Sequence, residues 1–223
     1  MPFQMAMAVA LGRVSLNDAL ERLARQERVD KMMEAHDLSR ALATQIVIGH
    51  ASLDMVLARR RLKEHREAFR LRSCLDEAKA TAVPMTFELH NHEKATGVVT
   101  EIEPYSVSVT PEGGEPVEIH KLQLKYAWNP SDWKVIKKAV KVDKAMAKES
   151  VDPIARPQDR YTCSDKRLFR YMDTKTQVQI TLLEGEQFKG EIMWFGRYEF
   201  AVQLKGGAQI TVFRHALHEM TDE

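Results

Sequence analysis

The chain has 223 residues, of which 44% are hydrophobic and 29% are charged, and its formal net charge is +1. This balance is typical of a globular protein and excludes a low-complexity or fibrous chain. It also argues against a protein that coats duplex DNA without selectivity, because such proteins carry a large positive charge. Residues 81–126 hold 7 acidic side chains against only 3 basic ones.

The cysteines and the apolar stretches bear on the location of the protein. The two cysteines lie far apart, fit no metal-ligand spacing and are predicted to be reduced thiols in a cytoplasmic protein. The longest stretches without charge, residues 1–12 and 41–53, are too short to cross a bilayer. No basic residue precedes the first apolar run. We therefore expect neither a secretory signal nor a membrane partner.

Residues 1–80 carry the pattern of a helical domain. Ser15 stands before an apolar run with Asp18 three positions on, an arrangement typical of a capping box at a helix start. Gly12 and Gly49 each follow an apolar run and precede a serine, as expected where one helix ends and the next begins. The sequence therefore predicts an N-terminal small helical bundle of four or five short helices.

The last of these helices, predicted over roughly residues 52–78, carries a row of basic side chains. A row of this kind is usually a solvated helix face. The alternative is a secondary nucleic-acid contact, in which the cations meet phosphates. That contact would use Arg59, Arg60, Arg61 and Lys63.

A pattern of glycines occurs twice in the rest of the chain, about ninety residues apart. Residues 97–122 and 190–216 each begin with one glycine, alternate apolar with polar residues, reach a Gly-Gly pair and close near basic residues. Self-similarity at a fixed period indicates a repeated structural unit, and the alternation indicates strands. We therefore predict two β-modules, at residues 81–127 and 161–223, joined by a lysine-rich linker or helix at residues 128–160.

Residues 164–220 resemble the bacterial family of Sm-like RNA chaperones called Hfq. The matching stretches are Leu182-Leu183-Glu184-Gly185, Phe188-Lys189-Gly190-Glu191-Ile192, Phe195, Leu204-Lys205 and Phe213-Arg214-His215-Ala216. The Sm-like plan is a short helix followed by five bent strands. The resemblance implies this plan for residues 161–223 and a degenerate copy of it for residues 81–127. The expected fold class is thus α+β multidomain, with a small helical bundle followed by two Sm-like five-stranded bent β-barrel modules.

The resemblance also implies a homo-oligomer. Protomers of that family close into a ring by joining edge strands, which satisfies backbone groups that an open sheet leaves unpaired. Six chains could pair their second modules and form a hexamer. Alternatively, three chains could use both modules and form a trimer with pseudo-six-fold symmetry.

The function that the resemblance implies is binding of RNA, as a post-transcriptional regulator or RNA chaperone. Short uridine-rich single strands would be held at the pore of the ring, where Arg214 and His215 reach phosphate and base edges and Phe200 stacks on a base. Glu199 stands where the family has a glutamine beside the stacking aromatic, and Lys189 adds a basic side chain. The acidic module at residues 81–127 is expected to be a spacer or ring partner.

Other readings of the sequence remain open at this point. The chain could be a multimerising scaffold or adaptor that displays the helical domain to a protein partner. His90, His92 and His120 suggest a metal site, but no fourth ligand is evident and we expect no metal. The sequence shows no nucleophile–base pair, glycine-rich phosphate loop or paired-carboxylate motif, so we expect neither an enzyme nor a cofactor.

Overall fold

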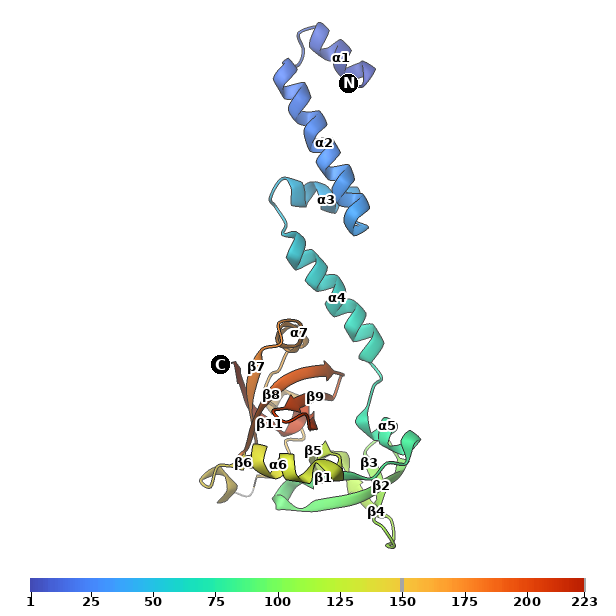
Figure 1. Cartoon of the computed structure of the whole chain (residues 1–223), viewed down its shortest axis with the longest axis vertical. Helices are drawn as coiled ribbons and strands as arrows, with labels where there is room; N and C mark the ends of the chain where they lie inside the picture. The colour runs from blue at the N-terminus through green and yellow to red at the C-terminus, as the bar shows by residue number, and fades with distance from the viewer. Residues whose placement is uncertain (149–150, 223) are drawn as a thin grey trace. The chain divides into compact units, whose positions relative to one another are not determined.

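The structure of the chain is a computed structural model that describes residues 1–148 and 151–222. These residues form seven α-helices and eleven β-strands, and the strands follow the first five helices (Figure 1). The chain divides into two compact units, Met1–Lys63 and Glu64–Glu223, which we call the helical unit and the strand unit. None of the helices in the described ranges is both long enough and apolar enough to cross a membrane.

The helical unit contains α1 (Phe3–Ala10), α2 (Leu16–His36), α3 (Arg40–Val47) and the first part of α4 (Leu53–Phe69). The predicted cap at Ser15 is confirmed, because its hydroxyl accepts a hydrogen bond from the backbone N–H of Asp18 at 3.0 Å. The core of the unit is small. It is formed by Val29, Leu38 and Ala43, with partly buried apolar side chains around them.

The single helix predicted over residues 52–78 is wrong, because the chain forms two helices there. α4 ends at Phe69, and α5 (Cys74–Thr81) begins after Ser73. The hydroxyl of Ser73 accepts a hydrogen bond from the N–H of Leu75, which satisfies one of the unpaired donors at the start of α5. A capping serine inside a helical pattern can thus mark a new helix start, which the apolar spacing does not show.

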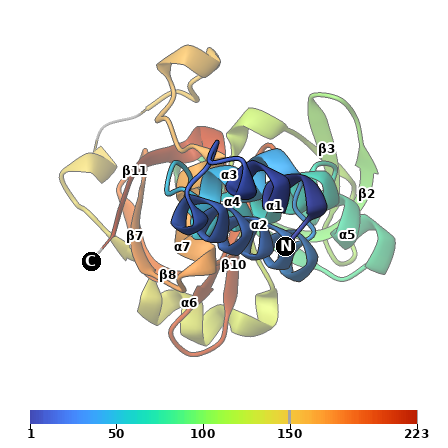
Figure 2. The same cartoon turned by 90° about the horizontal axis from the view of Figure 1, so that it is seen from above.

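The strand unit is built on one antiparallel sheet. Its order is β11-β7-β8-β9-β10-β5-β1-β2-β3-β4, with β6 paired to β8 outside this path. The strands are β1 (Met85–Leu89), β2 (Lys94–Ile102), β3 (Ser106–Thr110), β4 (Val117–His120), β5 (Leu124–Trp128), β6 (Lys141–Val142), β7 (Gln177–Leu182), β8 (Glu186–Phe195), β9 (Glu199–Leu204), β10 (Gln209–Phe213) and β11 (Leu217–Asp222). Figure 2 shows β7, β8 and β11 beside one another, in agreement with their pairing.

The predicted fold class of two separate Sm-like five-stranded bent β-barrel modules is wrong. β10 pairs with β5, with Ile210 opposite Trp128 and Val212 opposite Tyr126, so all strands belong to one large open sheet. An unpaired strand edge exposes backbone donors and acceptors that are costly to bury without partners. Here the edges of β5 and β10 satisfy each other. The alternating pattern of the sequence predicts strands but does not tell which strands pair.

The repeat itself is visible in the sheet. The strands β5-β1-β2-β3-β4 and β11-β7-β8-β9-β10 follow the same order, and equivalent residues lie 93 positions apart. Both copies also carry a β-bulge at the same place. One lies between Val99 and Glu101 in β2, and the other lies between Ile192 and Trp194 in β8. A bulge bends its strand and increases the local twist, so both copies curve at corresponding positions.

Two further helices lie in the strand unit. The lysine-rich linker or helix predicted at residues 128–160 is only in part helical. α6 (Trp133–Ala139) ends before β6, and a short 3₁₀ helix, η4 (Met146–Lys148), follows. α7 (Asp165–Asp173) buries Leu168, Phe169 and Tyr171 and agrees with the short helix expected at the start of residues 161–223. In the first repeat, α5 contributes Cys74, Leu75 and Ala78 to a core formed with β1 to β5.

Candidate nucleic-acid interface

Arg214, the predicted phosphate-binding residue, opens the short 3₁₀ helix η6 (Arg214–Ala216) after β10. Its guanidinium donates hydrogen bonds to the carbonyls of Cys163 (3.2 Å) and Gly196 (2.7 Å) and to the carboxylate of Asp165 (2.9 Å). Arg66 also contacts Asp165, at 3.0 Å. One carboxylate therefore faces two guanidinium groups, which leaves a local excess of positive charge. The Arg214 side chain remains 19% exposed.

Three of the other predicted pore residues lie inside the protein. Phe200 has no exposed surface, and Glu199 and His215 are also buried. Burial lowers the pKa of His215 to about 4, so its imidazole is neutral at pH 7 and adds no charge for a phosphate. Burial raises the pKa of Glu199 to about 7, although the N–H of Cys74 donates to its carboxylate at 2.5 Å. In this chain these side chains face the core and are not available to RNA bases.

Lys189 is exposed on β8, where it pairs with Gln179 of β7. Arg214 and His215 are adjacent in η6, and Phe213, the residue before them, pairs with Glu199 of β9. The structure thus brings Arg214, His215 and Glu199 together and places Lys189 on a different strand pair.

The turn between β8 and β9, which we call the second aromatic turn (Gly196–Tyr198), is hydrogen-bonded to Arg214 and presents exposed side chains. The Tyr198 side chain is 65% exposed, and the guanidinium of Arg197 lies over its ring at 5.1 Å from the centroid. The N–H of Arg214 donates to the Tyr198 carbonyl at 2.8 Å, and its guanidinium donates to the Gly196 carbonyl. Arg214 therefore anchors this turn from both ends.

The equivalent turn in the first repeat, between β2 and β3, has the same construction. We call it the first aromatic turn (Glu103–Tyr105). Tyr105 is 77% exposed, and the N–H of Lys121 donates to its carbonyl at 2.8 Å. The ammonium of Lys121 donates to the carbonyl of Glu103, as the guanidinium of Arg214 donates to Gly196. Each repeat thus presents one exposed tyrosine on a turn that a basic side chain holds in place.

The sequence reasoning missed both tyrosines. The signal was present, because Tyr105 and Tyr198 lie 93 positions apart, at the offset of the repeat. An exposed aromatic ring beside a cation can stack on a nucleic-acid base while the cation meets a phosphate. An aromatic ring exposed at the same place in two copies is not explained by core packing.

The basic row of the helical unit has a partly structural role. The guanidinium of Arg60 donates to the carbonyls of His36 (3.1 Å) and Asp37 (2.7 Å) at the C-terminal end of α2. Helix ends leave carbonyls without partners, and a basic side chain satisfies them. Arg59, Arg61 and Lys63 are exposed on α4. The contact of these side chains with nucleic acid stays a prediction.

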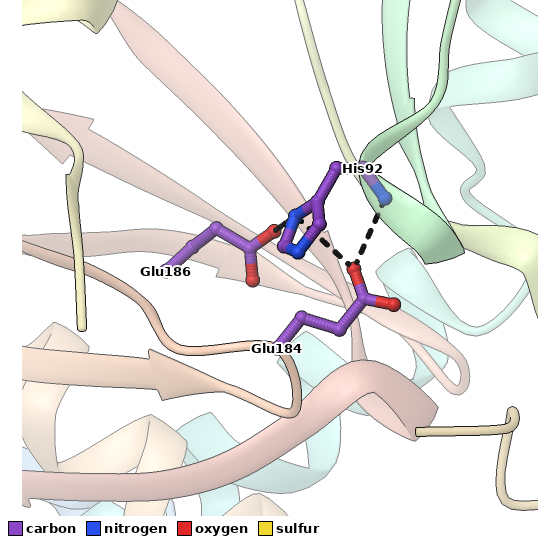
Figure 3. Close-up of side chains that lie close together, drawn as sticks. All are labelled: His92, Glu184 and Glu186. Atoms are coloured by element: carbon purple, nitrogen blue, oxygen red, sulfur yellow. Dashed lines mark hydrogen bonds and ion pairs between the residues drawn. The ribbon is translucent and has the colours of Figure 1, made fainter. Parts of the chain in front are cut away.

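A second polar site lies where the two repeats meet. His92, Glu184 and Glu186 each place one potential metal-binding atom within 4.8 Å of the others (Figure 3). The sequence reasoning considered His92 but not the two glutamates, because they lie some ninety residues further along the chain. This is the set of described residues that could hold a metal ion.

Comparison with known proteins gives no family for the chain. No protein-family model matches it, and no curated protein is significantly similar to it.

Proposed function

We propose that this chain is a non-enzymatic protein that binds short single-stranded RNA, with bases stacking on Tyr198 and phosphates meeting Arg197 and Arg214. The observation that carries the proposal is the second aromatic turn. The exposed ring of Tyr198 lies under the guanidinium of Arg197, and the guanidinium of Arg214 holds the backbone of the turn in place. Guanidinium groups suit phosphate because their donors form a planar fork. The preference for uridine-rich RNA is supported by the resemblance of residues 164–220 alone.

The first aromatic turn supplies a second, weaker contact in the same chain. Tyr105 offers the same exposed ring as Tyr198. Lys121 offers a point charge instead of a planar fork, and the residues around it are mainly acidic. Stacking on an aromatic ring contributes about 1–3 kcal/mol per base. One turn is therefore expected to bind weakly, and affinity has to come from several turns that contact the same strand.

Self-assembly would bring several turns together, and the sheet suggests how. β4 and β11 are the two ends of the strand order. By the offset of the repeat, β4 corresponds to β10 and β11 corresponds to β5, and β10 pairs with β5 inside the chain. The same pairing between copies would place Val117 opposite Thr221 of the next copy. We propose a closed homo-oligomer joined in this way. A hexamer joined through the second repeats would need a free edge on β10, but β10 is already paired within the chain, so three chains fit better than six.

A salt titration of RNA binding tests the proposed function. A fluorescent oligouridine is titrated with the full chain at about 50 mM and about 200 mM salt, and its anisotropy is followed. We expect binding at low salt that weakens steeply at high salt, because each phosphate contact releases a counterion. Absence of binding at low salt would overturn the proposal. Equal affinity at both salt concentrations would overturn the role given to the arginines.

A second candidate function is a multimerising scaffold that presents the helical unit to a protein partner. The observation that favours it is α1, whose side chains carry no charge and are not buried. Phe3, Met7 and Leu11 lie four positions apart and are all exposed, so they form an apolar stripe on one face. A scaffold would assemble but would not bind oligouridine, so the titration above separates the two functions.

A further inference from the structure

The polar site between the two repeats is built from three separate segments. His92 ends a short 3₁₀ helix, η1 (His90–His92), in the connection between β1 and β2 of the first repeat. Glu184 and Glu186 lie at the turn between β7 and β8 of the second repeat, and both are buried. Lys125 of β5 is fully buried beside them. Figure 3 shows the imidazole of His92 between the two carboxylates.

Three hydrogen-bond acceptors converge at this place. The Nε2 atom of His92 lies 3.2 Å from the carbonyl oxygen of Ala147, which can only accept, so Nε2 carries the ring proton. In the neutral imidazole Nδ1 is then a lone pair. It lies 3.6 Å from a Glu184 oxygen and 4.0 Å from a Glu186 oxygen. Since carboxylate oxygens also only accept, these three atoms repel one another unless a proton on Nδ1 or a bound cation lies between them.

Lys125 supplies one cation but does not balance the site. Its ammonium donates to both Glu184 and Glu186, so one positive charge faces two carboxylates, and the imidazoles of His90 and His92 lie 3.4 and 3.6 Å from Glu184. The second oxygen of the Glu186 carboxylate is buried and makes no hydrogen bond within the described residues. Buried charges are normally paired or bound to metal. With both imidazoles neutral, the site retains one negative charge, and one oxygen of the Glu186 carboxylate has no hydrogen-bond partner within the described residues.

The geometry points to a divalent cation of the zinc or manganese class, and we propose that His92, Glu184 and Glu186 bind it. Imidazole nitrogen and carboxylate oxygen suit these ions and bind zinc at about 2.0–2.2 Å. Two such ligands on a tetrahedral ion are about 3.4 Å apart, close to the separations of 3.6 and 4.0 Å found here. The Ala147 carbonyl holds the other ring nitrogen of His92, as is usual for histidines that bind metal.

Binding of the ion has two consequences for the chain. The ion competes with the Lys125 ammonium for the same carboxylate oxygens, so Lys125 sets an upper limit on affinity. The ligands also come from both repeats, with His92 from the first and the glutamates from the second. The ion therefore links the β1–β2 connection to the β7–β8 turn and stabilises the strand unit against unfolding.

Calorimetric titration of the full, chelator-treated chain with Zn²⁺ and then Mn²⁺ tests this inference. We expect one ion per chain and a raised melting temperature in its presence. His92→Ala and Glu186→Gln are expected to weaken binding about tenfold or more. His218→Ala is the matched control, because His218 is an exposed histidine of β11, and it should bind as the unchanged chain does.

The Lys125→Met variant shows whether the natural chain binds a metal ion at this site or has Lys125 as its sole cation. If the inference holds, the unchanged chain binds the ion and Lys125→Met binds it more tightly, because the competing ammonium is gone. If only Lys125→Met binds the ion, Lys125 is the sole cation of the natural chain and the inference fails. Equal binding by His92→Ala and the unchanged chain would also overturn it, and since His92 is half exposed this variant is expected to fold.

Discussion

Gly190 occupies the place in the second repeat that Gly97 occupies in the first. A Cβ atom on Gly97 would lie within 3.0 Å of the carbonyl oxygen of Thr110, and a Cβ atom on Gly190 would lie within 3.0 Å of that of Gln203. Both contacts are with backbone of the neighbouring strand, which cannot move aside alone. The glycines that reveal the repeat in the sequence are therefore required by the close approach of two strands.

Gly190→Ala is expected to destabilise the strand unit by about 3 kcal/mol, because the added methyl group forces β8 and β9 apart. Urea unfolding followed by circular dichroism measures the change. Lys189→Ala is a control in the same strand, because this side chain is exposed, and its effect should stay within about 0.5 kcal/mol. Similar stability of Gly190→Ala and the unchanged chain would show that β8 and β9 do not approach as described.

Some of the fold could be predicted from the sequence because it depends on local chemistry. Ser15 and Ser39 cap helices, and their hydroxyls accept from N–H groups three residues on. Gly113 and Gly206 lie in turns at positive φ, where glycine carries no steric penalty. The pairing of β10 with β5 could not be predicted, because any strand with an open edge offers the same backbone groups.

The candidate site was predicted less well, for a physical reason. Phe200 has an apolar side chain in a strand where nearly every residue is buried, so alternation could not show which face it takes. Tyr198 lies in a turn, and a turn has no alternation of apolar and polar residues from which the exposure of a side chain could be predicted. The approach of His92 to Glu184 depends on how two distant connections meet across the sheet. Only the three-dimensional arrangement contains that information.

The buried carboxyl of Glu199 predicts a pH dependence of stability. Its pKa in the folded chain is about 7, above its ordinary value of 4.5. Between these values the folded chain keeps a proton that the unfolded chain has lost, so this group lowers the free energy of unfolding as the pH rises. Glu199→Gln removes the effect and keeps an oxygen to accept from Cys74. The stability of the variant relative to the unchanged chain should rise by up to about 3 kcal/mol between pH 5 and pH 8.

Unfolding free energies of both proteins at several pH values check this expectation. The difference between the two proteins should change little below about pH 4, where Glu199 is protonated in the folded chain and mostly protonated in the unfolded chain. A constant difference between them across the whole range would mean that Glu199 is charged in the folded protein.

The proposed pairing between copies predicts the effect of a charge at Val117. This side chain is 51% exposed on β4, the end strand of the sheet. Val117→Asp would lie opposite Thr221 of the next copy and diagonal to Glu219, which shares a face with Thr221 on β11. Like charges on facing strands are destabilising, so the variant should have the mass of one chain where the unchanged chain has a multiple of it. Val117→Thr, which keeps a β-branched side chain, should assemble normally.

Light scattering coupled to size-exclusion chromatography measures these masses. If the unchanged chain has the mass of a single chain at micromolar concentration, the proposed assembly fails. RNA binding by single aromatic turns would remain to be tested separately.

The central claim is that bases stack on Tyr198, and oligouridine binding by Tyr198→Ala and Tyr198→Phe tests it most directly. Loss of the ring should weaken binding by at least about tenfold, because one stacked base contributes about 1–3 kcal/mol and every copy in the assembly loses its ring. Tyr198→Phe keeps the ring and should bind with an affinity close to that of the unchanged chain. The account is contradicted if Tyr198→Ala binds oligouridine as tightly as Tyr198→Phe does.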